Sequence, residues 1–235
     1  MPPSLTPERF AQGMTFDQYV AYIGTPENLR RESSGGGTRR DYSHIFEEAF
    51  RNSRLNEYQI EALTRLASMR GGPAKLLVIS EDWSSDCRRD VPMFARIAAV
   101  TGMDLRIFRR DGQKFSAAHV PSLDSAPDSS ADIMAQFLNH KNGDTWQSIP
   151  IAAFFTKDLD YLYHYTEYPA LYDKDRVVTE HIRGARPGET PEQTRDRGNR
   201  EFQELQDSAY FRIWASAAVD EIISALHRRM LLGAV

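Results

Sequence analysis

The sequence contains one cysteine, Cys87, in 235 residues. A disulfide within the chain is therefore excluded, and so is a redox cycle that uses two thiols of this chain. Positive charge is not in surplus either, because 29 Lys and Arg stand against 33 Asp and Glu, which gives a net charge of −4. A general nucleic-acid binder needs an excess of positive charge on at least one face. We therefore expect no nucleic-acid partner.

Long apolar runs and targeting signals are also missing. The apolar stretch at 210–226 is interrupted by Arg212, Asp220 and Glu221, and no run has the length of a membrane span. No basic segment followed by an apolar core opens the chain, so we predict a cytoplasmic protein with no membrane partner. The six histidines show no paired spacing typical of metal ligands. With a single cysteine beside them, we expect no metal site and no cofactor.

The first 72 residues are polar with a helical pattern, and they include a glycine run at 33–40, SSGGGTRR. No Gly-Lys-Ser or Gly-Lys-Thr follows this run and no strand precedes it, so a phosphate-binding loop is not indicated. We predict a flexible linker at 33–40. After it, Ile60, Leu63 and Leu66 recur on one helical face and Gly71-Gly72 ends the helix.

From Pro73 onward, strand patterns alternate with helical patterns. Continuous apolar runs bounded by turn residues predict buried strands, and apolar residues at helical spacing predict amphipathic helices. On this basis we predict strands at 75–80, 103–111, 148–156 and 159–166, and helices at 90–102, at 131–140 and over most of the chain from about 190. The last two strands are close enough for a hairpin.

A polar run, EDWSSDC, connects the strand at 75–80 to the helix after it. At this place thioredoxin-like proteins carry Trp-Cys-x-x-Cys, and the matching stretch here is Trp83-Ser84-Ser85-Asp86-Cys87. Ser84 stands where the attacking cysteine of the family would be, and Cys87 stands where the resolving cysteine would be. The stretch resembles a degenerate form of that active-site motif.

Two prolines extend the resemblance. Pro92 follows Cys87 by five residues, as does the helix-kinking proline of thioredoxins, and Ile149-Pro150 opens a strand where the family has a cis-proline facing the active site. The wider pattern, over residues 73–168, resembles a bacterial branch of the thioredoxin-like superfamily with Asp-Trp-Cys motifs. A parallel strand pair joined through a helix to an antiparallel hairpin is also the thioredoxin layout.

The resemblance implies an α/β protein with a thioredoxin fold, in which helices flank a central mixed sheet. We expect residues 73–170 to form the thioredoxin-like core. Residues 1–72 then form a helical N-terminal extension and residues 171–235 a helical C-terminal extension. All three parts are expected to pack as one compact unit.

The chemistry expected at the motif differs from that of thioredoxins. A hydroxyl is too weakly acidic to attack a disulfide, so we expect no classical dithiol reductase activity. Ser84 either caps the following helix or binds the thiol of a small cosubstrate, as serine does in some glutathione transferases. Cys87 is either a small buried apolar residue or a monothiol redox centre. In the second case the helix dipole, Arg88 and Arg89 would lower its pKa and Asp86 would oppose them.

These alternatives give three hypotheses for function. The first is a thiol redox protein acting as a monothiol through Cys87, the second a non-catalytic binding or adaptor protein, and the third a small-thiol transferase that uses Ser84. The expected partner is a protein thiol or disulfide, or a low-molecular-weight thiol. The residues expected to contact it are Trp83, Ser85, Asp86, Ile149 and Pro150. The sequence leaves the oligomeric state open.

Overall fold

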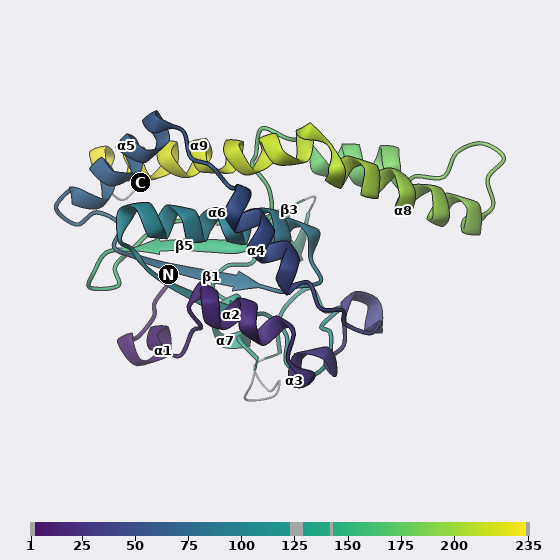
Figure 1. Cartoon of the computed structure of the whole chain (residues 1–235), viewed down its shortest axis with the longest axis horizontal. Helices are drawn as coiled ribbons and strands as arrows, with labels where there is room; N and C mark the ends of the chain where they lie inside the picture. Colours follow the sequence, from purple (N-terminus) through teal and green to yellow (C-terminus); the bar gives the residue numbers. More distant parts are fainter. Residues whose placement is uncertain (1–2, 123–128, 142, 234–235) are drawn as a thin grey trace.

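A computed structural model describes residues 3–122, 129–141 and 143–233. Its central sheet has the strand order β2-β1-β5-β6 (Figure 1). The four strands are β1 (Lys75–Ser80), β2 (Asp104–Arg109), β5 (Ile151–Phe155) and β6 (Tyr161–Thr166). β1 and β2 run parallel, whereas β1–β5 and β5–β6 are antiparallel pairs. The sheet is therefore mixed, which confirms the predicted thioredoxin-like α/β fold.

β1 is central because it is apolar on both faces. The four residues from Leu76 to Ile79 have no exposed surface, and neighbouring β5 is buried along its whole length. Continuous apolar runs of this kind indicate strands that are covered by helices on both sides. The strand predicted at 75–80 has the same bounds as β1.

Helices cover both faces of the sheet (Figure 1). One face carries α5 (Glu57–Ser68), α6 (Ser85–Thr101) and α9 (Ala209–Leu232). The other face carries α1 (Pro7–Ala11), α2 (Phe16–Ile23) and α7 (Ala131–Met134). α4 (Ser43–Asn52) packs against both α6 and α2. No helix in the described part of the chain combines the length and the apolarity needed to cross a membrane.

The glycine run near the start of the chain forms a tight turn instead of the predicted linker. It follows α3 (Pro26–Leu29) and contains the short 3₁₀ helix η1 (Ser34–Gly36). Gly35 has φ of 69° and Gly36 has φ of 79°, in the left-handed region that favours glycine. Glu32 and Thr38 pair across the turn. The turn reverses the direction of the chain, and Arg39, which follows it, is buried.

The helix predicted at 131–140 is wrong in its second half. α7 ends at Met134, and a small antiparallel hairpin follows, made of β3 (Asn139–Lys141) and β4 (Asp144–Trp146). Gly143 takes a left-handed φ of 79° just before β4. Glycine adopts this conformation more readily than any other residue, and the turn at Gly143 overrides the helical spacing of the residues before it.

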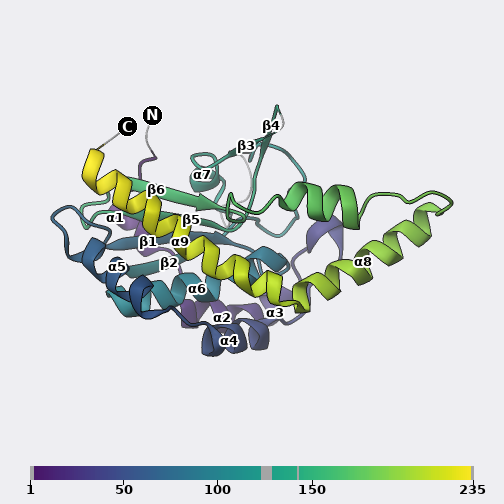
Figure 2. The ribbon, with the colours of Figure 1, turned by 90° about the horizontal axis from the view of Figure 1, so that it is seen from above.

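The C-terminal extension is helical, as predicted. It consists of the π-helix η2 (Asp175–Ile182), then α8 (Pro191–Asp207), then α9. α8 projects beyond the sheet in both views (Figures 1 and 2). Buried Arg197 attaches α8 to the end of η2, because its guanidinium donates to the carbonyls of Ile182 and Gly184 over 2.6 Å each. Arg197 also pairs with Glu189 in the connecting loop.

Candidate functional site

The stretch that resembles the thioredoxin motif lies where β1 ends and α6 begins. Ser84 is the N-cap of α6, and its hydroxyl accepts a hydrogen bond from the backbone N–H of Cys87 over 3.4 Å. Ser84, Asp86 and Cys87 are all buried, whereas Trp83 and Ser85 are half-buried. The cap closes the first turn of the helix, as one of the two sequence hypotheses for Ser84 states.

Cys87 has no exposed surface. Burial raises the pKa of its thiol to about 12 from an ordinary value of 9.0, and the negative charge of Asp86 acts in the same direction. Hydrogen bonding with Ser80, the Glu81 backbone and Ser84 opposes the rise in this pKa but does not cancel it. At neutral pH the side chain is therefore an uncharged thiol, and only a thiolate is nucleophilic.

The two arginines that follow Cys87 donate to other acceptors. Arg88 donates to the carbonyls of Asp82 and Trp83, over 3.1 and 2.9 Å. Arg89 is buried and donates through Nε and Nη2 to Asp90, over 2.7 and 2.6 Å. Both guanidinium groups are thus engaged by other acceptors. The thiol's loss of water on burial is the largest effect on the pKa of Cys87, and the net shift is upward.

Glu81, the first residue of the motif turn, is held by two arginines of the N-terminal extension. Arg31 donates from Nη2 to Oε1 over 2.8 Å, and Arg39 donates from Nη2 to Oε2 over 2.7 Å. The backbone N–H of Asp111, just after β2, also donates to Oε1 over 2.8 Å. Burial raises the pKa of Glu81, but the charges of Arg31 and Arg39 outweigh it and the net shift is downward. The carboxylate is ionised and fully partnered.

Asp82 extends this cluster. Its Oδ2 accepts from the Asn28 amide over 2.9 Å, and its Oδ1 accepts from Nη1 of Arg39. Burial raises the pKa of Asp82, and nearby Glu81 adds to the rise, while Arg39 opposes it. We call Asn28, Arg31, Arg39, Glu81 and Asp82 the N-terminal clamp.

A second buried cluster ties the first turns of α6 to the segment before η2. Asp86 accepts from Nη1 of Arg89 over 3.0 Å and from the ammonium group of Lys174. Burial raises the pKa of Asp86, but the charges of Lys174 and Arg89 outweigh this effect and lower it. Lys174 also donates to Glu167 over 3.3 Å. Asp86 is therefore neutralised by the C-terminal extension and is not presented to a partner.

Tyr165 of β6 completes the second cluster. Its hydroxyl donates to Oδ2 of Asp90 over 3.0 Å, and its ring packs edge-on against Phe94. Asp90 and Tyr165 are both buried. This aromatic residue of the β6 strand thus packs against α6, which is the role that a buried strand tyrosine with a polar partner usually has.

Trp83 is one of the two half-buried residues of the motif turn. The Trp83 ring meets Phe115 in an edge-on contact with centroids 5.5 Å apart, and the Arg110 guanidinium lies 5.2 Å from the Trp83 centroid. The indole N–H of Trp83 has no acceptor among the described residues. Ser85 is the other half-buried residue of the turn. These two side chains are the part of the motif that faces outward.

Ile149 and Pro150 lie at the same end of the sheet as the motif. Ile79 pairs with Ile151 in the β1–β5 register, so Pro150 stands one residue further along, level with the end of β1. The Ile149–Pro150 peptide bond is cis, and both residues are buried. The register therefore brings the motif turn and the Ile149–Pro150 segment to the same end of the sheet.

The residues that partner the buried carboxylates of the two clusters escaped sequence reasoning. Arg31, Arg39 and Lys174 supply positive charge, and Asn28 and Tyr165 donate hydrogen bonds. The available signal was the Glu81-Asp82 pair itself, since two adjacent acidic residues directly after a buried strand need cationic partners if they are buried. The described residues contain no group of three or more His, Cys, Asp or Glu side chains arranged to hold a metal ion.

Comparisons with known proteins agree with this architecture. A 1.5 Å crystal structure of a protein of unknown function from Pseudomonas aeruginosa superposes with a TM-score of 0.50 at 14% identity, covering 95% of this chain and 98% of the other. An HIV epitope scaffold gives a TM-score of 0.48 at 14% identity, covering 96% of each chain. At this identity the first likeness concerns the fold alone. No curated protein matches the sequence.

The sequence also matches a family model described as thioredoxin, over residues 46–180. This match covers more than half of the chain and includes β1, the motif turn, α6 and the antiparallel strands. The mixed sheet and the position of Trp83 to Cys87 between β1 and α6 agree with it. The chain therefore belongs to the thioredoxin family.

Proposed function

We propose that this chain is a non-catalytic member of the family, a binding protein that keeps the thioredoxin fold without its thiol chemistry. The observation that carries the proposal is the state of Cys87, which has no exposed surface and a pKa raised to about 12. Thiol–disulfide exchange begins with an accessible thiolate. A buried thiol with this pKa is neither accessible to a disulfide nor ionised at neutral pH.

The geometry favours this function over the two catalytic hypotheses. A monothiol cycle through Cys87 requires the first turn of α6 to open, and a transferase that uses Ser84 requires the hydroxyl to meet a ligand. The Ser84 side chain instead accepts from the Cys87 N–H in the closed helix cap, and the residue is 8% exposed. Its hydroxyl is engaged in stabilising α6.

The binding surface that we propose consists of Trp83 and Ser85, the half-buried residues of the motif turn. Ile149 and Pro150 lie at the same end of the sheet but are buried, so they are not part of this surface. Aromatic side chains are enriched in the contact regions of protein interfaces. The proposed ligand is accordingly a partner polypeptide.

Alkylation of Cys87 tests whether thiol chemistry is absent. From the rise of the pKa to about 12, we expect the native thiol to react with iodoacetamide at pH 8 at least about a thousandfold more slowly than the same thiol in denaturant. Insulin reduction should stay at background. A native rate within about tenfold of the denatured rate would overturn the proposal in favour of a monothiol centre.

A photo-cross-linking experiment tests the binding surface. A photoreactive amino acid at Ser85 should capture a discrete partner, and capture should persist in Cys87→Ala but fall in Trp83→Ala. Trp146→Ala is the matched control, because Trp146 is 39% exposed on β4 and is not part of the motif turn. Capture that is lost equally in Trp146→Ala, or unaffected by Trp83→Ala, contradicts the proposed surface.

A further inference from the structure

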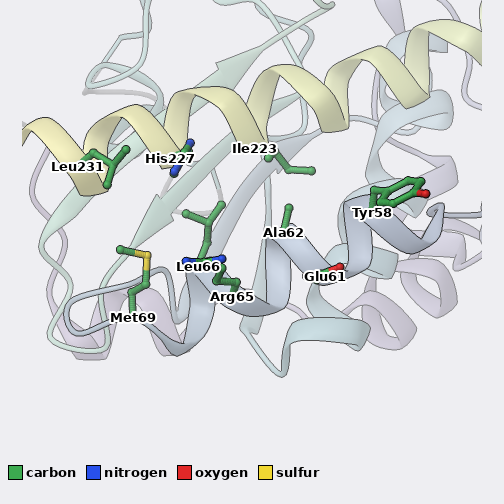
Figure 3. Close-up of a pocket in the computed structure, with 9 residues that line it drawn as sticks. All are labelled: Tyr58, Glu61, Ala62, Arg65, Leu66, Met69, Ile223, His227 and Leu231. Atoms are coloured by element: carbon green, nitrogen blue, oxygen red, sulfur yellow. The ribbon is translucent and has the colours of Figure 1, made fainter.

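A groove of about 370 Å³ lies between α5 and α9 (Figure 3). Its lining includes the apolar side chains of Ala62, Leu66, Met69, Ile223 and Leu231. Figure 3 shows Met69 and Leu231 toward one end of the groove and Tyr58 at the other. None of the motif residues lines it, so this surface is separate from the proposed binding surface at Trp83.

The ends of the groove leave large apolar groups in water. Tyr58 is 74% exposed and Leu231 is 64% exposed, and Leu232 next to it is 69% exposed. Isolated exposed apolar residues are ordinary, but several on the rim of one apolar groove indicate an interaction site. The charges on the same groove determine which partner fits.

The α5 side of the groove is complementary to itself. Tyr58, Glu61, Arg65 and Met69 line it at intervals of three or four residues and so share one face of the helix. Glu61 and Arg65 are exposed, and neither forms an ion pair with another described residue. If a second α5 lies antiparallel with Leu63 at the centre, Glu61 of one copy meets Arg65 of the other. The same register places Tyr58 opposite Ser68, next to Met69, and aromatic–thioether contacts are favourable.

We propose that two copies of this chain form a dimer about a twofold axis through the α5–α9 groove, with the two α5 helices antiparallel. Twofold symmetry makes each contact occur twice, so both Glu61–Arg65 pairs form together. α5 has 12 residues, a length of about 18 Å, which lets the two helices overlap along their whole length. The apolar ends of each groove are then covered by the other copy.

Sedimentation velocity of the full chain over a range of concentrations tests the dimer. The wild type should show a reversible monomer–dimer equilibrium. Glu61→Arg alone or Arg65→Glu alone replaces two attractive pairs by two repulsive ones, so each should weaken dimerisation by about tenfold or more. The double variant Glu61→Arg/Arg65→Glu restores opposite charges and should dimerise again. An equimolar mixture of the two single variants should form heterodimers.

Glu48→Arg and Arg40→Glu are the controls, because both residues are exposed and lie outside α5 and the groove. They should leave the equilibrium unchanged. A wild type that stays monomeric at high concentration overturns the proposal. The same holds if the groove of the monomer binds an amphipathic peptide or a fatty acid instead of a second copy. A dimer that ignores both single reversals, or that is not recovered in the double variant, also overturns it.

Discussion

The guanidinium of Arg39 donates to the carboxylate of Glu81, with 2.7 Å between Nη2 and Oε2. This ion pair is buried, with side-chain exposures of 0% and 1%. Arg39→Ala leaves Glu81 with one arginine and deprives Asp82 of its own cationic partner. Removing one member of a buried ion pair costs about 3 to 5 kcal/mol. We expect a loss of this size in the free energy of unfolding, measured by urea denaturation.

Arg40→Ala is the matched control for Arg39→Ala, because the neighbouring Arg40 is exposed. It should change the free energy of unfolding by less than about 0.5 kcal/mol. Equal losses in both variants would contradict the clamp's role in stability. Arg39→Lys should recover part of the loss, since an ammonium keeps the charge but cannot donate to Glu81 and Asp82 with the same fork.

Tyr165→Phe should destabilise the second buried cluster. The substitution removes the hydroxyl that donates to Asp90 over 3.0 Å and keeps the ring against Phe94. Loss of one hydrogen bond to a buried carboxylate costs about 1 to 3 kcal/mol, measurable by denaturation. Tyr163→Phe provides the comparison, because its hydroxyl donates to Glu221 over 3.2 Å in a half-buried setting. A larger loss in Tyr163→Phe than in Tyr165→Phe would contradict this assignment.

Ser84→Cys supplies the missing thiol of a Cys-x-x-Cys motif, and we expect it to leave insulin reduction at background. The position is 8% exposed and the neighbouring thiol has no exposed surface, so a disulfide substrate cannot reach either sulfur. Ser84→Ala is the control for the loss of the cap, expected to cost about 1 kcal/mol. Strong reductase activity in Ser84→Cys would show that the wild type lacks this activity because residue 84 is a serine, and not because the site is buried.

Acid should loosen the connection between η2 and α8. Hydrogen bonding from Arg197 lowers the pKa of Glu189 to about 2 from an ordinary value of 4.5. Because the folded-state pKa is the lower one, this group stabilises the fold fully above pH 4.5 and loses its effect as the pH falls toward 2. The hydrogen-exchange protection factors of the segment at 182–198, which correct for the pH dependence of the intrinsic exchange rate, should therefore fall over that range.

Glu189→Gln should remove this pH dependence and raise exchange in the same segment at neutral pH. Glu192→Gln, an exposed change in the first turn of α8, should keep the pH dependence. If the protection factors fall equally in the wild type and in Glu189→Gln on acidification, the effect belongs to other groups.

The central sheet was predictable because its strands carry their own signal. The run 75–80 is apolar at its four central positions, 76–79, and this pattern alone indicates a strand covered on both faces. The hairpin at β3 and β4 was not predicted, although Gly143 marks its turn, because the helical spacing before it was extended too far. Local turn chemistry therefore carried information that periodicity did not.

The position of the motif was predictable, but the state of its side chains was not. Whether Cys87 is buried and whether Arg88 turns toward it depend on what covers α6, and those elements lie far away in the sequence. Arg39 precedes Glu81 by 42 residues and Lys174 follows Asp86 by 88. A single sequence offers no way to pair such charges, because each alone is compatible with a solvated surface.

The N-terminal clamp also decides which fragment of this chain can be studied in isolation. The family match begins at residue 46, beyond Asn28, Arg31 and Arg39. A fragment that begins at residue 46 retains the buried carboxylates of Glu81 and Asp82. It lacks Arg31 and Arg39, the clamp residues that neutralise them. The family match is thus shorter than the part of the chain that holds the motif carboxylates, and the segment before residue 46 is an integral part of the scaffold.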